Sequence, residues 1–170
     1  GKLNSIEASI DRHSAMGAWQ YTLPNDASVE TVDWDRYISG LPKQPFDAMK
    51  FFRWRNYREF GTGASGDMFV HLLTAIHMIT SSKGPARIFC SGQLSMWKDG
   101  RDVPDVMNAL MEYPETAEHG AFQVNLRLNF ASGAGEGFRV RFIGDEGAME
   151  LGDDLTITHN IIPKAPGIGN

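Results

Sequence analysis

The chain has 170 residues, 42% of them hydrophobic and 22% charged, which are ordinary values for a globular protein. A chain of this length can form one domain that buries roughly two-thirds of the surface it exposes when unfolded. The net charge of -5 and the isoelectric point near 5.5 argue against a nucleic-acid-binding protein, which would need a basic surface.

Cysteine use and hydropathy narrow the class further. Cys90 is the only cysteine, so no disulfide can form within the chain, and its apolar surroundings (ARIFCSG) predict an inert thiol in the core. No apolar run approaches membrane-spanning length, and no signal peptide is recognisable. Because the sequence begins abruptly in strand-like alternation, we expect that an upstream part of the protein is missing.

The first half of the chain predicts one strand, a long loop and short helices. Residues 3–9 alternate loosely as a strand, and the polar residues 13–33 form an excursion. Asp33 is placed to cap a short helix that Gly40 and Pro42 end. Asp47 is placed to cap a second one, through the aromatic and basic stretch of residues 51–60.

A glycine-rich turn then leads into the clearest helical pattern, at residues 67–81. The second half is strand-like, with candidates at residues 86–97, 105–114, 121–130, 137–144 and 155–161. Short connections favour antiparallel pairing. The sequence therefore predicts an α/β (α+β) domain over residues 1–170, with a large, mostly antiparallel open-faced sheet and helices on one face.

The alternation in residues 122–130 is strict and defines a second, polar face. Gln123, Asn125, Arg127 and Asn129 share that face, and Arg139 and Arg141 join it if the two strands pair in register. These positions include no acid and no lysine. Amides with arginine suit a subunit interface better than open solvent, so we expect self-association through this face.

The glycine turn, residues 61–66 (GTGASG), matches the G-x-G-x-x-G pattern of dinucleotide-binding loops. The arginine-rich segment before it is unlike a buried strand, and no Asp or Glu occurs between Met68 and Lys98 to bind a ribose. The segment is therefore not predicted to bind NAD. Its glycines are expected instead to let the backbone approach a ligand.

Asp67 and His71 are four positions apart, with Thr74 on the same face of the predicted helix. One interpretation is structural: Asp67 caps the helix and satisfies a core histidine. The other is catalytic: Asp67 orients His71, which exchanges a proton with a substrate hydroxyl. The upstream Arg53, Arg55 and Tyr57 would add hydrogen-bonding groups for such a ligand.

Other polar groups point to structural roles. His77 lies among apolar residues and is predicted to be structural. Asp99, Asp102 and Asp105 depart from the calcium-loop pattern and predict a hairpin connection. No spacing of histidines indicates a metal site.

The order and spacing of several motifs resemble the C-terminal half of Gfo/Idh/MocA-type oxidoreductases over residues 17–151. The motifs are TVDWDRYISGLPKQPFD, RWRNYREFGTGASGD leading to His71, DGRDVPDVMNALMEYP and FIGDEGAMEL. The resemblance implies an NAD(P)-dependent enzyme of sugars or polyols, whose C-terminal domain contacts substrate and forms the oligomer interface. The family's D-x-x-x-H motif falls on Asp67 and His71; Thr74 stands where the broader family often has an aspartate.

The resemblance also implies what this chain lacks. The family's N-terminal Rossmann domain binds NAD or NADP and carries a catalytic lysine in an E-K-P motif, which does not occur here. The chain alone is therefore expected to be inactive and to bind no cofactor and no metal. His71 and Asp67 are the expected catalytic residues, and the substrate contacts are Arg53, Arg55, Tyr57, Gly63 and Thr74.

Three functions stay open on the sequence. The first is sugar or polyol oxidation, and the second is NAD-dependent glycoside hydrolysis by the same fold. The third is a binding or assembly domain without catalysis. The expected partners are a carbohydrate-like substrate, the protein's own Rossmann domain and further copies forming a dimer or tetramer, with no nucleic acid or membrane. No feature fixes the compartment; the cytoplasm is the default and the periplasm the alternative.

Overall fold

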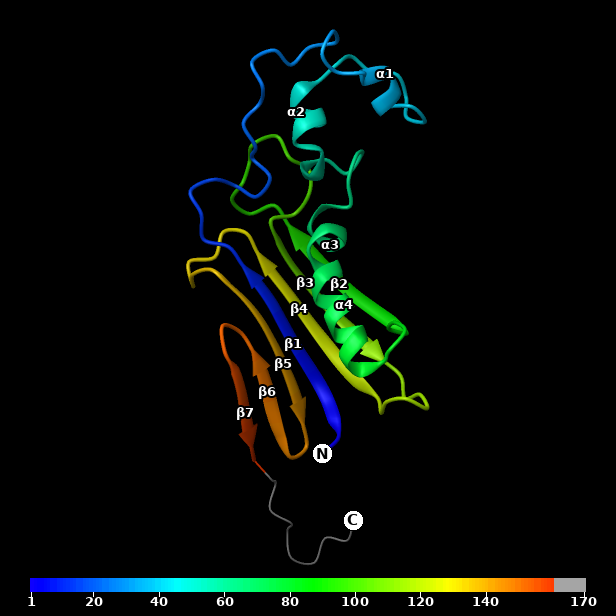
Figure 1. Ribbon diagram of the computed structural model, residues 1–170, viewed down its shortest axis with the longest axis vertical. Coiled ribbons are helices and arrows are strands. Elements are labelled where there is room, and N and C mark those ends of the chain that lie inside the picture. The colour runs from blue at the N-terminus through cyan, green and yellow to red at the C-terminus, as the bar shows by residue number, and fades with distance from the viewer. Residues whose placement is uncertain (161–170) are drawn as a thin grey trace, which may run out of the picture.

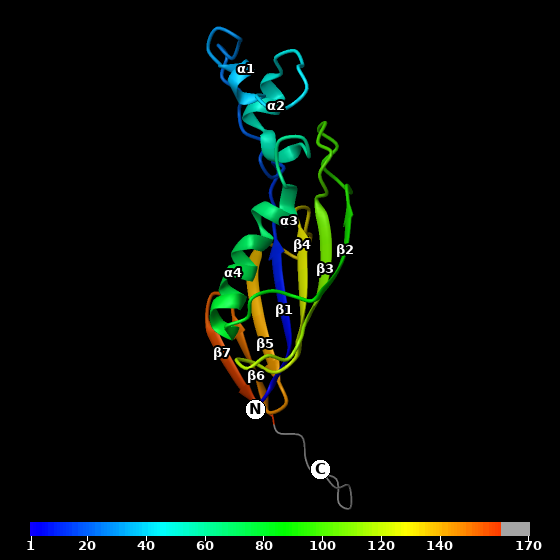
Figure 2. The same cartoon turned by 90° about the vertical axis from the view of Figure 1, so that its right-hand side faces the viewer.

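The computed structural model describes residues 1–160, and its main feature is a seven-stranded sheet with helices on one side (Figure 1). Seen from the side, α4 (Phe69–Thr80) lies along one face, while the shorter helices stand beyond one end of the sheet (Figure 2). The spatial order is β2-β3-β4-β1-β5-β6-β7. The strands are β1 Leu3–Asp11, β2 Arg87–Gln93, β3 Val106–Tyr113, β4 Phe122–Asn129, β5 Gly137–Gly144, β6 Gly147–Leu151 and β7 Leu155–His159.

The pairing confirms the predicted mostly antiparallel, open-faced sheet. Within residues 1–160 only β1 and β4 run parallel, and every other neighbouring pair is antiparallel. Each predicted strand is present, and β6 is a strand that the sequence did not predict. Its five residues are all half-buried, so it lacks the alternation that marked the others. The last predicted residue, Ile161, lies outside the described residues.

The core forms where the sheet's apolar face meets α4. Along β4, Val124, Leu126 and Leu128 are at most 1% exposed, whereas the residues between them face outward. On α4, Phe69, Leu72 and Ile76 recur at helical spacing and are at most 2% exposed. The predicted apolar face is therefore the buried face, and α4 is the helix that covers it.

The two predicted helix caps are confirmed. The Asp33 carboxylate accepts a hydrogen bond from the Arg36 backbone N–H in α1 (Trp34–Tyr37), at 3.2 Å. The Asp47 carboxylate does the same for Lys50 in α2 (Ala48–Phe52), at 3.1 Å. The second helix is shorter than predicted, because a 3-10 turn, η1 (Trp54–Asn56), follows it.

The predicted helix over residues 67–81 is wrong at its start. A five-residue helix, α3 (Gly63–Asp67), ends before Met68, and α4 begins at Phe69. Met68 has φ -110°, and the His71 backbone N–H bonds to the Met68 carbonyl rather than four residues back. Asp67 therefore closes one helix instead of capping the next. Ser81, in the left-handed region at φ 58°, ends α4 as predicted.

Two further predictions are corrected. Cys90 is exposed rather than buried, because it lies on β2, an edge strand whose seven residues are all exposed. Asn125 and Arg127 do share a face with Arg139 and Arg141, but that face is not free of acids. It carries them because β1 lies between β4 and β5 and adds two carboxylates; further ones come from β3 and β6. These acids are Glu7, Asp11, Glu112 and Glu150.

Candidate active site

An ion pair joins η1 to the end of α3. The Arg55 Nε lies 2.9 Å from Asp67 Oδ1, and both side chains are only about one-third exposed, at 31% and 27%. The Arg55 guanidinium also lies 4.2 Å from the centroid of the Trp54 ring, within range of a cation–π contact. Arg55 and Asp67, which the sequence predicted to act together in one site, are therefore in direct contact just before α4 begins.

His71 occupies the first turn of α4 with an exposed side chain. Among residues 1–160 its ring makes no hydrogen bond, and Asp67 bonds to Arg55 instead. The predicted orientation of His71 by Asp67 is thus not observed, because the break at Met68 separates the two residues. Both ring nitrogens of His71 are free to meet a ligand, which removes the core-histidine interpretation.

The remaining predicted contacts differ in what they can still bind. Arg53, the residue before η1, donates from Nε to the Tyr21 carbonyl at 2.8 Å, which joins this segment to the loop of residues 13–33. Burial, with the charges of Asp47 and Asp99, raises the pKa of Tyr57, so its hydroxyl stays protonated at neutral pH. Thr74 Oγ1 donates to the Val70 carbonyl at 2.7 Å and can only accept from a ligand.

The glycine turn is shaped by packing within the chain. Gly63 has φ +59°, and a Cβ there would lie 3.1 Å from Val103; a Cβ at Gly66 would meet the Thr62 hydroxyl. A hollow of about 320 Å³ lies beside the turn, with Gly61, Gly63, Val103, Pro104 and Met107 among its lining residues. Gly63 therefore borders a space, and its contact with a substrate stays a prediction.

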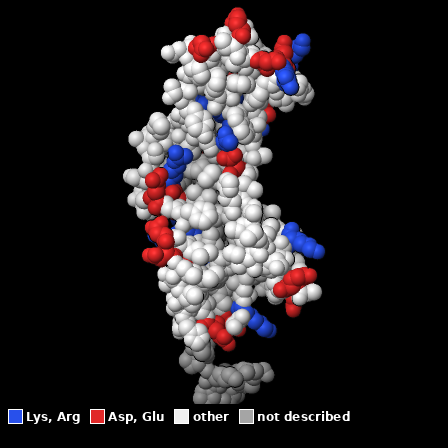
Figure 3. Space-filling view, in the orientation of Figure 1, with Lys and Arg blue, Asp and Glu red and all other residues white. Residues whose placement is uncertain are grey.

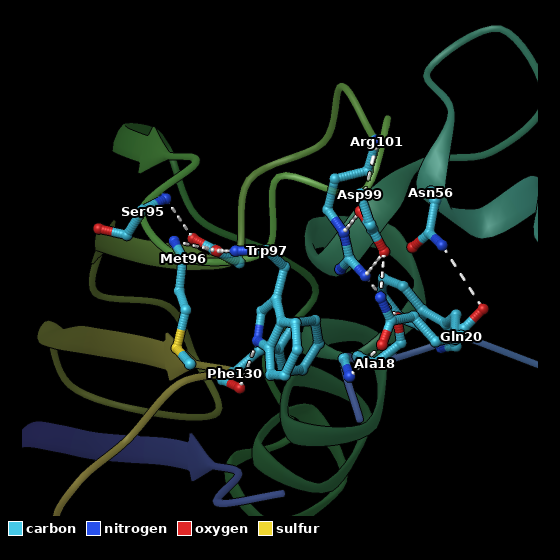
Figure 4. A network of polar contacts seen from close by, with 12 residues as sticks. Ala18, Gln20, Asn56, Ser95, Met96, Trp97, Asp99, Arg101 and Phe130 are labelled. Carbon is cyan, nitrogen blue, oxygen red and sulfur yellow. Dashed lines mark hydrogen bonds and ion pairs between the residues drawn. The ribbon is translucent and has the colours of Figure 1, made fainter. Parts of the chain in front are cut away.

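A buried polar network holds this region together, and the sequence did not predict it (Figure 4). The Arg101 side chain is fully buried and donates to both carboxylate oxygens of Asp99, at 2.7 and 2.8 Å, and to the Ala18 carbonyl at 3.0 Å. Gln20 donates to Asp99 at 2.7 Å. Burial alone would raise the pKa of Asp99, but these hydrogen bonds and the Arg101 charge lower it to about 2.

The aspartates of the DGRDVPD loop each have a partner inside the chain. Asp105, fully buried, accepts hydrogen bonds from the backbone N–H groups of Ser95, Met96 and Trp97 at 2.7 to 2.8 Å (Figure 4). Asp102 accepts from the Arg58 backbone N–H at 2.8 Å. Within the described residues no group of three or more acidic, His or Cys side chains could hold a metal ion. The loop holds backbone groups in place, and it joins the antiparallel neighbours β2 and β3, which confirms the predicted hairpin connection.

His77 has the structural role that the sequence predicted. Its Nε2 lies 2.8 Å from the Tyr113 hydroxyl, and the two rings meet edge to face at 5.7 Å. Burial raises the pKa of Tyr113 to about 12. The pair locks one flank of α4 onto β3.

Comparison with known proteins places this geometry in a family. The GFO/IDH/MocA C-terminal domain matches residues 36–150. No curated protein matches the chain. None of the helices within residues 1–160 is long and apolar enough to cross a membrane.

Solved structures share the fold at low identity. An oxidoreductase from Pseudomonas syringae has a TM-score of 0.55 at 15% identity, over 96% of this chain and 33% of its own. A levoglucosan dehydrogenase, solved with NADH and levoglucosan, has a TM-score of 0.54 at 16% identity. The match covers 94% of this chain and 36% of the dehydrogenase. An oxidoreductase from Sinorhizobium meliloti has a TM-score of 0.51 at 15% identity. The match covers 97% of this chain and 35% of the oxidoreductase. The chain spans about a third of the length of each of these proteins. The match of the family model over residues 36–150 shows that the chain belongs to the GFO/IDH/MocA C-terminal domain family.

Proposed function

We propose that this chain is the substrate-binding domain of an NAD(P)-dependent oxidoreductase of sugars, polyols or related hydroxylated compounds. The observation that carries the proposal is His71, which is exposed at the start of α4, makes no ring hydrogen bond among residues 1–160, and lies four residues after Asp67 of the Arg55–Asp67 pair. The levoglucosan dehydrogenase of similar fold, with its bound NADH and sugar, supports the substrate class. The cofactor, NAD or NADP, would be held by an N-terminal Rossmann domain of the same protein.

The proposed roles follow from the free atoms of each side chain. When bound, the nicotinamide would supply or accept the hydride at the substrate carbon. His71 would take the proton from the substrate hydroxyl in oxidation and return it in reduction. Arg55 keeps its Nη groups as donors and Asp67 keeps Oδ2 as an acceptor, which together suit a pair of neighbouring hydroxyls. Arg53, Tyr57, Gly63 and Thr74 would complete the contacts around the substrate.

Two other functions compete with this one. NAD-dependent glycoside hydrolysis would use the same groups, with transient oxidation followed by cleavage. A binding or assembly domain would use the sheet alone and leave His71 idle. The exposed, unbonded His71 favours a catalytic role over the assembly role.

A substrate panel on the full-length protein tests the proposal. NAD or NADP reduction is followed with free sugars, polyols and glycosides. We expect net reduction of NAD or NADP when a sugar or polyol is the substrate. Release of sugar from glycosides without net reduction of the cofactor would indicate hydrolysis. Titration of the 170-residue chain with NAD and NADP by calorimetry should give no binding. Low-micromolar binding that Gly63→Val abolishes would return the glycine turn to a nucleotide role.

We also propose self-association through the polar face of the sheet. That face is hollowed, with a volume of about 860 Å³, and its lining includes Glu7, Arg127, Arg139, Arg141 and Glu150. Arg139 has no ion-pair partner among residues 1–160 and could pair across a two-fold axis. Light scattering should find a dimer or tetramer. A monomer at high micromolar concentration would leave this face to solvent.

A further inference from the structure

Asp102 holds the two residues on either side of Tyr57. Its backbone N–H donates to the Asn56 carbonyl at 3.1 Å. Its carboxylate accepts from the Arg58 backbone N–H at 2.8 Å, and its carbonyl accepts from Arg58 Nε at 3.1 Å. We call these three hydrogen bonds the Asp102 clamp. They bracket Tyr57 from a residue 44 positions after Arg58 in the chain.

The clamp is anchored by the neighbours of Asp102 in the chain. Arg101 before it has a fully buried side chain that bonds to Asp99, and Val103 after it is 2% exposed. Asp102 itself is exposed. Its carboxylate can therefore be removed with little loss of stability, because exposed groups outside the core contribute little to the free energy of unfolding.

The loop that carries Asp102 also lies against the Tyr57 ring. A Cβ at Gly100 would lie 3.9 Å from the Tyr57 hydroxyl oxygen, which is an ordinary contact distance. Within residues 1–160 that hydroxyl makes no hydrogen bond; burial and nearby charges are what act on it. The loop therefore fixes the backbone around Tyr57 and leaves the hydroxyl available to a ligand.

Asp102 also joins the two walls of the hollow beside the glycine turn. Residues 58 and 61–65 line one side, and Val103, Pro104 and Met107 are among the residues that line the other. Because Asp102 directly precedes Val103 and bonds to Arg58, its hydrogen bonds set the separation of the walls at that end. The volume, about 320 Å³, lies within the range of about 300 to 1,000 Å³ found for ligand pockets.

We propose that Asp102 is a positioning residue for substrate binding, which fixes the segment of Tyr57 so that the free hydroxyl meets the substrate. The proposal rests on the proposed function in one respect, because Tyr57 is a proposed substrate contact. A group that is already in place loses little conformational freedom when the ligand arrives, so the clamp strengthens binding. A contact made equally in the ground state and the transition state changes KM and leaves kcat unchanged.

The test measures kcat and KM of the full-length protein and three variants with the best substrate of the panel. Asp102→Ala removes the acceptor for the Arg58 N–H and should raise KM about fivefold to tenfold, as for one lost hydrogen bond, at unchanged kcat. Asp102→Asn keeps an acceptor oxygen and should keep KM. Tyr57→Phe should raise KM as Asp102→Ala does, and combining the two should add nothing, because both remove the same contact.

Glu59→Ala is the matched control for the lost charge. Figure 3 shows acidic and basic side chains close together in the upper part of the molecule, where α1 and α2 lie, so removal of any carboxylate there changes the local charge. The Glu59 carboxylate bonds to Gln44 and Lys50 and not to the segment around Tyr57. Glu59→Ala should therefore keep the KM of the unchanged protein.

Amide hydrogen exchange tests the clamp separately from activity. In the full-length protein the Arg58 amide should exchange at least about tenfold faster in Asp102→Ala and at the normal rate in Asp102→Asn. An unchanged exchange rate or an unchanged KM in Asp102→Ala would overturn the proposal, and so would effects on KM that add in the double variant. Absence of hydride transfer with every substrate would contradict the proposed function instead, and the exchange rate would still decide whether Asp102 holds this segment.

Discussion

The sheet layer and the cap, by which we mean residues 12–62 with the loop of residues 94–105, are held together by different interactions. In the sheet, alternating apolar side chains meet α4, and Val124, Leu126 and Leu128 are almost fully buried. In the cap, the buried ion pair of Arg101 with Asp99 bonds to the Ala18 carbonyl and to Gln20, and these bonds join segments far apart in the chain. Aromatic rings form its own small core, with Tyr37 and Phe51 4.8 Å apart.

The difference concerns precision as well as stability. Apolar burial has no preferred direction, so the sheet tolerates changes of side chain at similar volume. Hydrogen bonds and ion pairs are directional, and those of the cap lie in the segments that carry Arg53, Arg55 and Tyr57. Most of the buried apolar side chains lie in the strands and α4, and the cap holds the groups that we propose to contact substrate.

The largest effect on stability should come from breaking the buried pair of the cap. Arg101→Ala would leave Asp99 and the Ala18 carbonyl without their donor, and removing one partner of a buried pair costs about 4 kcal/mol of unfolding free energy. Urea denaturation measures it. Lys43→Ala, at an exposed lysine without an ion-pair partner in residues 1–160, is the control and should change stability by less than about 0.5 kcal/mol. Equal losses would mean that the cap does not depend on this pair.

The matching change in the sheet is Leu126→Ala. Leu126 is 1% exposed at the centre of β4, so the lost contacts and the cavity should cost about 3 kcal/mol. The unfolding free energy lost in Leu126→Ala should be the same at pH 6 and at acid pH, because no titrating group is involved. A strong pH dependence of the Leu126→Ala loss would contradict the separation of the two regions.

Acid should weaken the cap selectively. The pKa of Asp99 is lowered from 3.8 to about 2 in the folded chain, so the carboxylate stabilises the fold above its unfolded pKa. That stabilisation, about 2 kcal/mol, should be lost as the pH falls from about 4 to about 2. Urea unfolding across this range checks it. Asp99→Asn should remove this part of the pH dependence, and an unchanged acid profile in that variant would assign it elsewhere.

The smallest effect concerns a helix cap. Asp47→Ala removes the acceptor for the Lys50 backbone N–H and should cost about 1 kcal/mol, while Asp47→Asn should cost less because its side-chain oxygen still accepts. Thermal unfolding of both variants measures the difference. Equal losses of stability in the two variants would show that Asp47 does not stabilise α2 through its side-chain oxygen.

The two regions also differ in what the sequence could predict. Strict alternation in residues 122–130 identified β4 and its faces, since a strand's period of two is written in one local stretch. The two acids that β1 adds to the polar face, Glu7 and Asp11, were missed because the parallel pairing of β1 with β4 is a long-range contact. Asp67 and His71 were predicted from spacing, and the break at Met68, which separates them, has no local signal.

The buried network was beyond prediction for the same physical reason. Arg101 lies between Asp99 and Asp102 in a charged loop whose composition predicts exposure to solvent. Arg101 is buried only because the segment of Ala18 and Gln20, far away in the sequence, packs against this loop. Cys90 was misassigned because an apolar strand at the edge of a sheet has the same composition as one at its centre.

The most direct test of the central claim is single-turnover hydride transfer by the full-length protein with His71→Ala. If His71 moves the substrate proton, the rate should fall by about 10² to 10⁴, with the cofactor still bound. Met78→Ala, on the exposed face of the same helix, is the control and should keep the rate of the unchanged protein. A folded His71→Ala variant with an unchanged rate would contradict the account and leave this histidine without a catalytic role.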